Sequence, residues 1–296
     1  MSVSSMALRG LMELAGRSRT VSRGLTRGLS VFTFHDVTDN PSPFQVTADV
    51  ATPTEVFRHQ VEWIARTFDV IDPVTIGHPE TLPPNAAMIS FDDAWPGTFT
   101  NGLAILDELA IPAIAFLNYC GVDHGIDATA LSAFERGFDA GFPDMSYRHD
   151  RPSDPDSFRA FQGELVSEST IDEWDGHPRF WFGSHLYWHV VSIGAKRPEL
   201  EESYQRNAER LAELNNGVEF VSFPFGQPDD HFDDSHVATV RCLGAKRVFS
   251  ARSRVNRGPL GYVVDRTSMP TKDSSPGRAL VHLFHRELLD RLGRTR

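Results

Sequence analysis

Short apolar runs recur along this chain and alternate with segments of helical periodicity, and this alternation limits the folds that the chain can adopt. The runs lie at residues 29–34, 86–91, 113–117, 180–182, 220–223, 247–250 and 262–264. Runs with almost no polar interruption are typical of strands buried on both faces of a parallel sheet. Strands that alternate with helices form right-handed βαβ units. We therefore predict an α/β fold with one parallel sheet, open or closed.

Helices are predicted between these runs. The first is expected to begin at a capping box, Thr52-Pro53-Thr54-Glu55, with proline at the first helical position. Its apolar stripe consists of Phe57, Val61, Ile64 and Phe68. A second stripe consists of Leu200, Tyr204, Leu211 and Leu214, and residues 279–292 predict a C-terminal helix.

The chain is predicted to form one domain, because no linker divides it and no repeat is detectable. Residues 28–296 form the expected domain, and residues 1–27 precede it as a basic segment, helical or disordered. Residues 122–168 are rich in Asp, Gly, Pro and Ser and interrupt the alternation. In an α/β barrel a long insertion usually lies over the active-site face. A surface excursion without a role is the alternative.

Residues 1–30 contain five arginines and a single acidic residue, Glu13. Arginine and glycine interrupt the apolar stretches, so neither a signal-peptide core nor a transmembrane span is predicted. Leu8, Leu11, Met12 and Ala15 share one helical face. That face could make weak peripheral contact with an anionic membrane, pack on the domain, or belong to a disordered lead-in. The expected location is cytoplasmic, at the inner face of the membrane if this contact exists.

The charge and the cysteine content exclude some classes of function. Acidic residues outnumber basic ones by 40 to 29, a net charge of −11, whereas sequence-independent nucleic-acid binding requires a basic surface. The two cysteines, Cys120 and Cys242, form no Cys-x-x-Cys pair. Neither a thiolate zinc site nor dithiol redox chemistry is therefore predicted. The oligomeric state cannot be predicted from the sequence.

Two adjacent carboxylates, Asp92 and Asp93, follow the apolar run at 86–91. Parallel α/β folds place catalytic groups at the C-terminal ends of their strands. Neighbouring strand residues point to opposite faces, so both carboxylates can serve one site only where the chain turns. One could then bind a metal while the other handles a proton. Alternatively, the pair caps the following helix.

His185 and His189 are four residues apart and are predicted to face the same way on a helical turn, which suits one metal ion. Leu186 excludes the His-Glu-x-x-His motif of zincin metalloproteases. Zinc sites that do chemistry usually have three protein ligands and one open position. The acidic pair is the best candidate for the third ligand. The alternative is that both histidines make only local hydrogen bonds.

A third motif occupies residues 220–226, with the sequence Phe-Val-Ser-Phe-Pro-Phe-Gly. It predicts a buried strand that ends in a turn, where backbone N–H groups are exposed. An ordinary exit from a strand into a loop is the alternative.

As an ordered set, these motifs resemble those of the polysaccharide deacetylase family, which has the chitooligosaccharide deacetylase homology domain. Residues 34–37 resemble its Tyr-His-x-Val strand, and residues 90–94 its Thr-Phe-Asp-Asp-Gly motif. Residues 183–189 are similar to its Gly-Ser-His-Thr-x-x-His signature, and residues 223–226 to its Tyr-Pro-Tyr-Gly turn. Leu82-Pro83-Pro84 and Asp265-Arg266 also fall where the family has similar residues. The likeness covers roughly residues 29–268 and implies a distorted (β/α) barrel with about seven parallel strands.

The resemblance implies an activity and particular roles. Asp93, His185 and His189 would bind a divalent metal, most commonly zinc, and Asp92 would be the general base. A backbone N–H near Phe225 would help to stabilise the oxyanion. The implied reaction is hydrolysis of N-acetyl groups on an amino-sugar-containing glycan or glycan precursor.

Some positions depart from the family pattern. They are Ala94 for glycine, Leu186 for serine or threonine, and Ser222 where some members have arginine. The general acid of the family lies in a Leu-x-x-His motif near the C-terminus, which neither His282 nor His285 matches. His35 on the first strand is the preferred candidate for the acid, with His282 and His285 as alternatives.

Other functions remain compatible with these residues. The same barrel could hydrolyse a non-sugar amide, or the chain could be a non-catalytic glycan-binding relative, against which the intact Asp92 argues. Two histidines and one carboxylate can also hold Fe(II) for oxygen chemistry. A second aspartate beside the ligand suits hydrolysis better.

Overall fold

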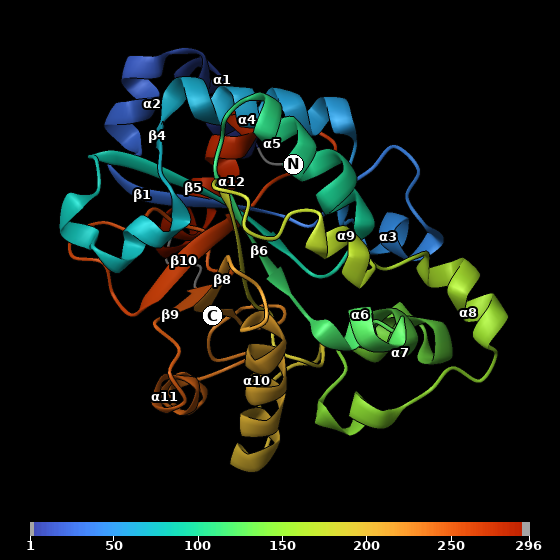
Figure 1. Ribbon diagram of the computed structural model, residues 1–296. Helices are drawn as coiled ribbons and strands as arrows, with labels where there is room; N and C mark the ends of the chain where they lie inside the picture. The colour runs from blue at the N-terminus through green and yellow to red at the C-terminus, as the bar shows by residue number, and fades with distance from the viewer. Residues whose placement is uncertain (1–2, 292–296) are drawn as a thin grey trace.

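The computed structural model describes the backbone of residues 3–291 and the side chains of residues 10–284, and its centre is a closed parallel barrel (Figure 1). Within this part of the chain, seven strands form the barrel: β1 (Gly28–Phe34), β5 (Asn85–Asp92), β6 (Ala113–Leu117), β7 (Phe180–Ser184), β8 (Gly217–Ser222), β9 (Arg247–Ser250) and β10 (Val263–Ser268). All their pairings are parallel, and the pairing of β1 with β5 closes the circle. The predicted distorted (β/α) barrel with about seven strands is confirmed.

The strands form where the apolar runs predict them, because their side chains are buried both inside the barrel and beneath the helices. Every residue of β5 and β6 is buried. Strand β10 continues four residues beyond its predicted run, to Ser268. Its Asp265, Arg266 and Thr267 are polar yet buried. Hydropathy alone therefore placed the end of this strand too early.

Helices surround the barrel and connect its strands (Figure 1). They are α3 (Pro43–Ala48), α4 (Thr54–Thr67), α5 (Ala104–Glu108), α6 (Tyr119–His124), α7 (Ala128–Arg136), α8 (Pro155–Gln162), α9 (Glu168–Asp172), α10 (Arg197–Leu211) and α11 (Asp234–Cys242). Short strands β2 (Asp36–Val37) and β3 (Ala51–Thr52) pair with each other, and β4 (Asp69–Val70) pairs with β5. The predicted capping box is wrong: Thr52 belongs to β3, and the Asp39 carboxylate accepts the Thr54 N–H at 3.0 Å instead.

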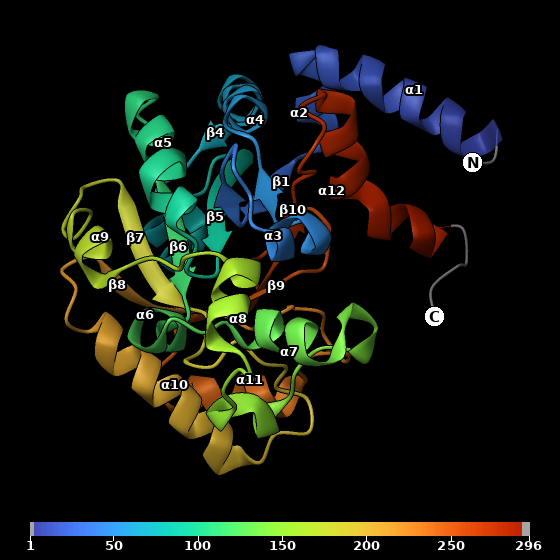
Figure 2. The same ribbon diagram turned by 90° about the vertical axis from the view of Figure 1, so that its right-hand side faces the viewer.

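The predicted insertion at 122–168 contains helices of its own. It extends from the end of α6 through α7 and α8 to the start of α9. Figure 2 shows α7 and α8 beside the end of the barrel to which the arrow of β7 points, which is the C-terminal end of the parallel strands. The insertion is therefore next to the residues that follow the strands.

The two ends of the described chain lie together, away from α10 and α11 (Figure 2). Helices α1 (Val3–Arg17) and α2 (Arg19–Leu25) precede β1, and α12 (Pro276–Arg291) follows β10. Gly16 contacts Pro276 so closely that a Cβ on Gly16 would lie 2.7 Å from the proline side chain. This contact requires glycine and holds α1 against α12. Among the described helices, none is both long and apolar enough to span a membrane.

Candidate active site

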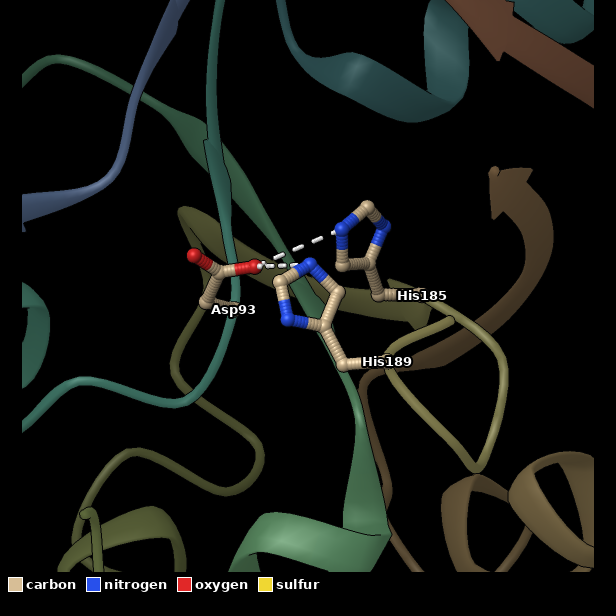
Figure 3. Close-up of side chains that lie close together, drawn as sticks. All are labelled: Asp93, His185 and His189. Atoms are coloured by element: carbon tan, nitrogen blue, oxygen red, sulfur yellow. Dashed lines mark ion pairs between the residues drawn. The ribbon is translucent and has the colours of Figure 1, made fainter. Parts of the chain in front are cut away.

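Three of the side chains singled out in the sequence converge at the C-terminal end of the barrel (Figure 3). Asp93 follows β5, and His185 and His189 follow β7. One donor atom from each lies within 4.8 Å of the others. Asp93 Oδ1 is 3.4 Å from His185 Nε2 and 3.2 Å from His189 Nε2. The Asp93 oxygen thus faces both imidazole rings from the opposite side of the site.

A change of backbone direction brings the adjacent aspartates to one site. Asp92 is the last residue of β5, and Asp93 has a φ of 73°, in the left-handed region. This turn interrupts the alternation of a strand, which would otherwise direct the two side chains to opposite faces. The sequence-based condition, that the chain must turn between the two aspartates, is met.

The helical turn predicted for the histidine pair is wrong. The chain from His185 to His189 is a loop without helical hydrogen bonding. Leu186 has a φ of 59°, which a right-handed helix does not allow. The Leu186 side chain is instead buried in a cluster with Leu200 and Tyr204. The loop still brings both Nε2 atoms to the same carboxylate oxygen.

Hydrogen bonds at Nδ1 fix the tautomer of both histidines. The Nδ1 atom of His185 lies 2.8 Å from the carbonyl oxygen of Ser222, and a carbonyl can only accept. The Nδ1 atom of His189 lies 2.6 Å from Asp127 Oδ2. In its neutral form each ring therefore carries its proton on Nδ1 and has its Nε2 lone pair free to bind a metal.

Asp93 provides the second indication that the site suits a cation. Its Oδ1 is buried and accepts no hydrogen bond, whereas Oδ2 accepts one from Trp95 Nε1 at 3.1 Å. Burial alone would raise the pKa of Asp93, but the charges of His189 and His185 keep that pKa well below its ordinary value. A buried anionic oxygen without a donor, facing two imidazoles, matches the donor set of a divalent cation such as zinc.

The insertion supplies Asp127, a site residue that belongs to none of the sequence motifs. It is the N-cap of α7: its Oδ1 accepts the Ala130 N–H at 2.8 Å, leaving Oδ2 for His189. Its own N–H donates to Gln162 Oε1 at 2.7 Å. Burial would lower the pKa of His189, but Asp127 and Asp93 outweigh it and raise that pKa to about 9. Helix capping can be predicted from sequence, but contact with a residue 62 positions away cannot.

Asp92 is paired with Arg266 of β10. The guanidinium donates to both carboxylate oxygens, each at 2.7 Å, and its Nη2 also donates to Ser222 Oγ at 2.6 Å. Both side chains are buried. Burial alone would raise the pKa of Asp92, but the charge of Arg266 lowers it below its ordinary value. Asp92 is thus paired with a guanidinium from β10, and position 222 is a serine that accepts from the same group.

These side chains border one cavity of about 210 Å³. It is lined by Asp92, Asp93, His185, His189, Arg266, His35, Phe225, Thr33, Phe44, Ala48, Val50, Thr129, Phe142, Ala251 and Ser268. Thr129 and Phe142 belong to the insertion, so this segment forms part of the wall.

The candidate acids differ in position. His35 lines the cavity. His282 lies on α12, where its Nδ1 is 3.1 Å from the Ser268 carbonyl oxygen, and it is not among the described residues that line the cavity. The His285 side chain lies outside the described residues. Phe225, the candidate for the oxyanion contact, has a φ of 62°, and its ring stacks on His189 with centroids 5.1 Å apart.

Comparisons with known proteins agree on the fold. IcaB from Ammonifex degensii matches with a TM-score of 0.63 and 19% identity, over 88% of this chain and 98% of the other. The deacetylase PplD of Streptococcus pyogenes, solved in complex with acetate, matches with a TM-score of 0.62 and 12% identity, over 86% of this chain and 98% of PplD. The polysaccharide deacetylase BC0361 of Bacillus cereus matches with a TM-score of 0.61 and 13% identity, over 87% of this chain and 69% of BC0361. No family model and no curated relative matches the chain. The expected likeness to polysaccharide deacetylases is confirmed at the level of the fold.

Proposed function

We propose that this protein is a metal-dependent hydrolase that removes N-acetyl groups from an amino-sugar-containing glycan or glycan precursor. One observation carries the proposal: the buried, donor-free oxygen of Asp93 faces the Nε2 atoms of His185 and His189, beside a second carboxylate, Asp92. A metal-dependent hydrolase needs both side chains that bind the metal and a group that accepts a proton from the attacking water. The shared fold with a polysaccharide deacetylase and with a deacetylase that binds acetate supports this substrate class.

In the proposed mechanism, Asp93, His185 and His189 hold the cation. A divalent cation bound there, such as zinc, which this donor set suits, would polarise the acetyl carbonyl and lower the pKa of the attacking water. Asp92 accepts the proton of that water, and the bidentate contact with Arg266 keeps Asp92 ionised and oriented.

Two further residues complete the proposed cycle. His35 lines the same cavity and donates a proton to the leaving amine. A backbone N–H near Phe225, which also lines the cavity, would stabilise the charge that develops on the acetyl oxygen. Breaking the C–N bond then releases acetate and a free amino sugar.

Acetate release tests the proposal. Protein loaded with one equivalent of zinc or cobalt should release acetate from at least one member of a panel of N-acetylated sugars and chito-oligosaccharides. Asp92→Asn should abolish turnover and retain the metal, whereas Asp93→Asn should lose the metal. Release of acetate from none of the panel would refute the proposal, and retention of metal only in Asp93→Asn would reverse the two roles.

Adding N-acetylated amino acids and simple anilides to this panel separates the alternatives. Turnover of N-acetylated amino acids or simple anilides, without turnover of any sugar, would indicate a hydrolase of non-sugar amides. Binding of glycans without turnover, measured calorimetrically, would indicate a non-catalytic relative. The position of Asp92 favours an enzyme, because its ionised carboxylate lies in the same cavity as the three candidate metal ligands.

We also propose that α1 and α2 contact an anionic membrane. Met12 and Ala15 of the predicted face pack against the core, so the contact would rest on other residues. The exposed side chains of α1 and α2 include Leu11, Leu14, Val21 and Leu25 together with Arg17 and Arg19. Apolar and cationic groups on one short segment suit an anionic lipid surface, whereas the whole chain is acidic. The protein should sediment with vesicles that contain phosphatidylglycerol, and a Leu11→Ser/Leu14→Ser variant should not. Equal sedimentation of both proteins would refute this contact.

A further inference from the structure

Exposed aromatic side chains lie at the candidate active site. Of the large apolar side chains that the structure describes as exposed, two are phenylalanines of the insertion: Phe142, with 54% of its surface exposed, and Phe138, with 44%. Burying a phenylalanine on folding stabilises a protein, so two exposed rings beside a cavity require a reason. Neither ring is needed for metal binding or proton transfer.

Phe142 is the outermost ring of a stack that begins at a candidate metal ligand. Phe225 stacks on His189, and Phe142 lies against Phe225 with centroids 4.1 Å apart. His231 meets the Phe142 ring edge-on at 5.3 Å. Phe142 is therefore held in a defined orientation while about half of it remains open to water, and it also lines the cavity.

A second pair of rings lies on another part of the wall. Phe44 of α3 lines the cavity, and Phe138 stacks on Phe44 with centroids 5.9 Å apart and the ring planes 14° from parallel. Phe161 of α8 contacts both Phe44 and Phe138. The insertion thus places an exposed aromatic ring beside the cavity in two places.

The size of the cavity indicates what these rings contact. Pockets that enclose a whole drug-sized ligand measure about 300–1,000 Å³, and this cavity is about 210 Å³. It has room for the acetamido group and part of the sugar that bears it. Any further sugar unit of a longer substrate must therefore lie outside the cavity, against the surface that borders it.

We propose that Phe142, assisted by Phe138, forms an aromatic platform that stacks against the sugar ring next to the acetylated unit. This inference rests on the proposed function and assigns its substrate class: a chain of sugars rather than a monosaccharide. A pyranose ring has an apolar face of C–H groups and hydroxyl groups around its edge. Stacking on a phenyl ring buries the apolar face while the hydroxyl groups remain in water.

The test compares Phe142→Ala, Phe142→Leu and Phe142→Tyr with the unaltered protein, each loaded with zinc. The substrates are N-acetylglucosamine and the chito-oligosaccharides of two to four units. Leucine conserves apolar bulk without an aromatic face, and tyrosine conserves the face. For the tetramer, Ala and Leu should lower kcat/KM at least about tenfold, mainly through KM, and Tyr should stay within about twofold. The loss should be smaller for the monosaccharide.

Equal losses for the monosaccharide and the tetramer would overturn the proposal, because the ring would then only support His189 through Phe225. Leucine acting as well as tyrosine would overturn it too. Calorimetric titration of the tetramer separates this question from catalysis. If the unaltered protein binds the tetramer and Phe142→Leu does not, the platform stands even without acetate release. If the unaltered protein does not bind the tetramer, the platform is refuted.

Discussion

The Asp127 carboxylate on the insertion lies 2.6 Å from His189 Nδ1, on the loop after β7, although the two residues are 62 positions apart in the chain. One oxygen of Asp127 caps α7, and the other orients a candidate metal ligand. A carboxylate behind a metal-binding histidine fixes its tautomer and makes it a stronger ligand.

Replacing Asp127 should therefore weaken metal binding without unfolding α7. In Asp127→Asn the amide can still cap the helix, since asparagine is as good an N-cap as aspartate. The side chain can no longer offer His189 an anionic acceptor. We expect the zinc affinity to fall about 10–100-fold, measured by competition with a chelating dye.

Asp154→Asn is the matched control for this prediction. Asp154 caps α8 in the same insertion, where Oδ1 accepts the Ser157 N–H at 3.2 Å. We expect its zinc affinity to equal that of the unaltered protein. A similar loss in both variants would assign the effect to helix capping, and no loss in Asp127→Asn would contradict the positioning role.

The pair formed by Asp92 and Arg266 should show strong coupling in stability. Arg266→Met leaves a buried carboxylate without its partner and should lower the free energy of unfolding by about 3–5 kcal/mol. Adding Asp92→Asn removes the uncompensated charge, so the double variant should be more stable than Arg266→Met alone. Urea denaturation of the four metal-free proteins completes the cycle. Additive losses would show that the two side chains do not interact.

Substrates with different leaving groups should reveal whether His35 is the acid. His35→Gln should lower kcat for an N-acetyl sugar about 10²–10⁴-fold, because the amine leaves only after it is protonated. The loss should be much smaller for 4-nitrophenyl acetate, whose leaving group needs no proton. His282→Gln serves as the comparison, since His282 lies on α12 and contacts the Ser268 carbonyl. Equal losses of His35→Gln on both substrates would exclude this role.

Asp36 should make stability depend on pH. Burial raises the pKa of Asp36 from 3.8 to about 6, although Gln45 Nε2 donates to it at 2.8 Å. The folded protein therefore keeps the Asp36 proton between about pH 4 and pH 6, where the unfolded chain has lost it. This contribution to stability is complete below about pH 4 and is lost as the pH rises through 6. A shift of about two pKa units corresponds to about 3 kcal/mol.

Asp36→Asn provides the measurement, since its amide does not titrate. Relative to the unaltered protein, this variant should gain about 3 kcal/mol of unfolding free energy between pH 4 and pH 7.5. Urea denaturation at several pH values gives the difference directly. Stability curves that stay parallel over this range would show that Asp36 is already ionised at low pH.

Local patterns in the sequence predict the barrel and the residues that converge. Apolar runs identify buried strands because burial on both faces excludes polar residues. The acidic pair could be assigned to one site because Asp92 ends a strand and Asp93 follows it. The roles of these residues in catalysis remain predictions that the experiments above test.

Long-range contacts explain what the sequence did not indicate. The pairing of Asp127 with His189 joins two loops whose relative position depends on the whole barrel. Arg266 lies in the second half of β10, where the buried residues are polar, so hydropathy alone placed the end of this strand before Arg266. The loop of His185 and His189 has helical spacing without a helix, because Leu186 adopts a left-handed conformation that its sequence does not require. Each of these features is set by tertiary structure.

The insertion at 122–168 contributes both Asp127, behind His189, and Phe142, at the mouth of the cavity. Under the proposed function, recognition of the sugar and binding of the metal would therefore both depend on this one segment. Replacing this segment with that of a relative would change sugar recognition and metal affinity together. A segment chosen only for its sugar preference would therefore also alter how tightly the metal binds. Changes in the sequence of this segment must then preserve metal binding as well as sugar recognition. New specificity for sugars should therefore arise through changes around Phe142 that leave Asp127 in place.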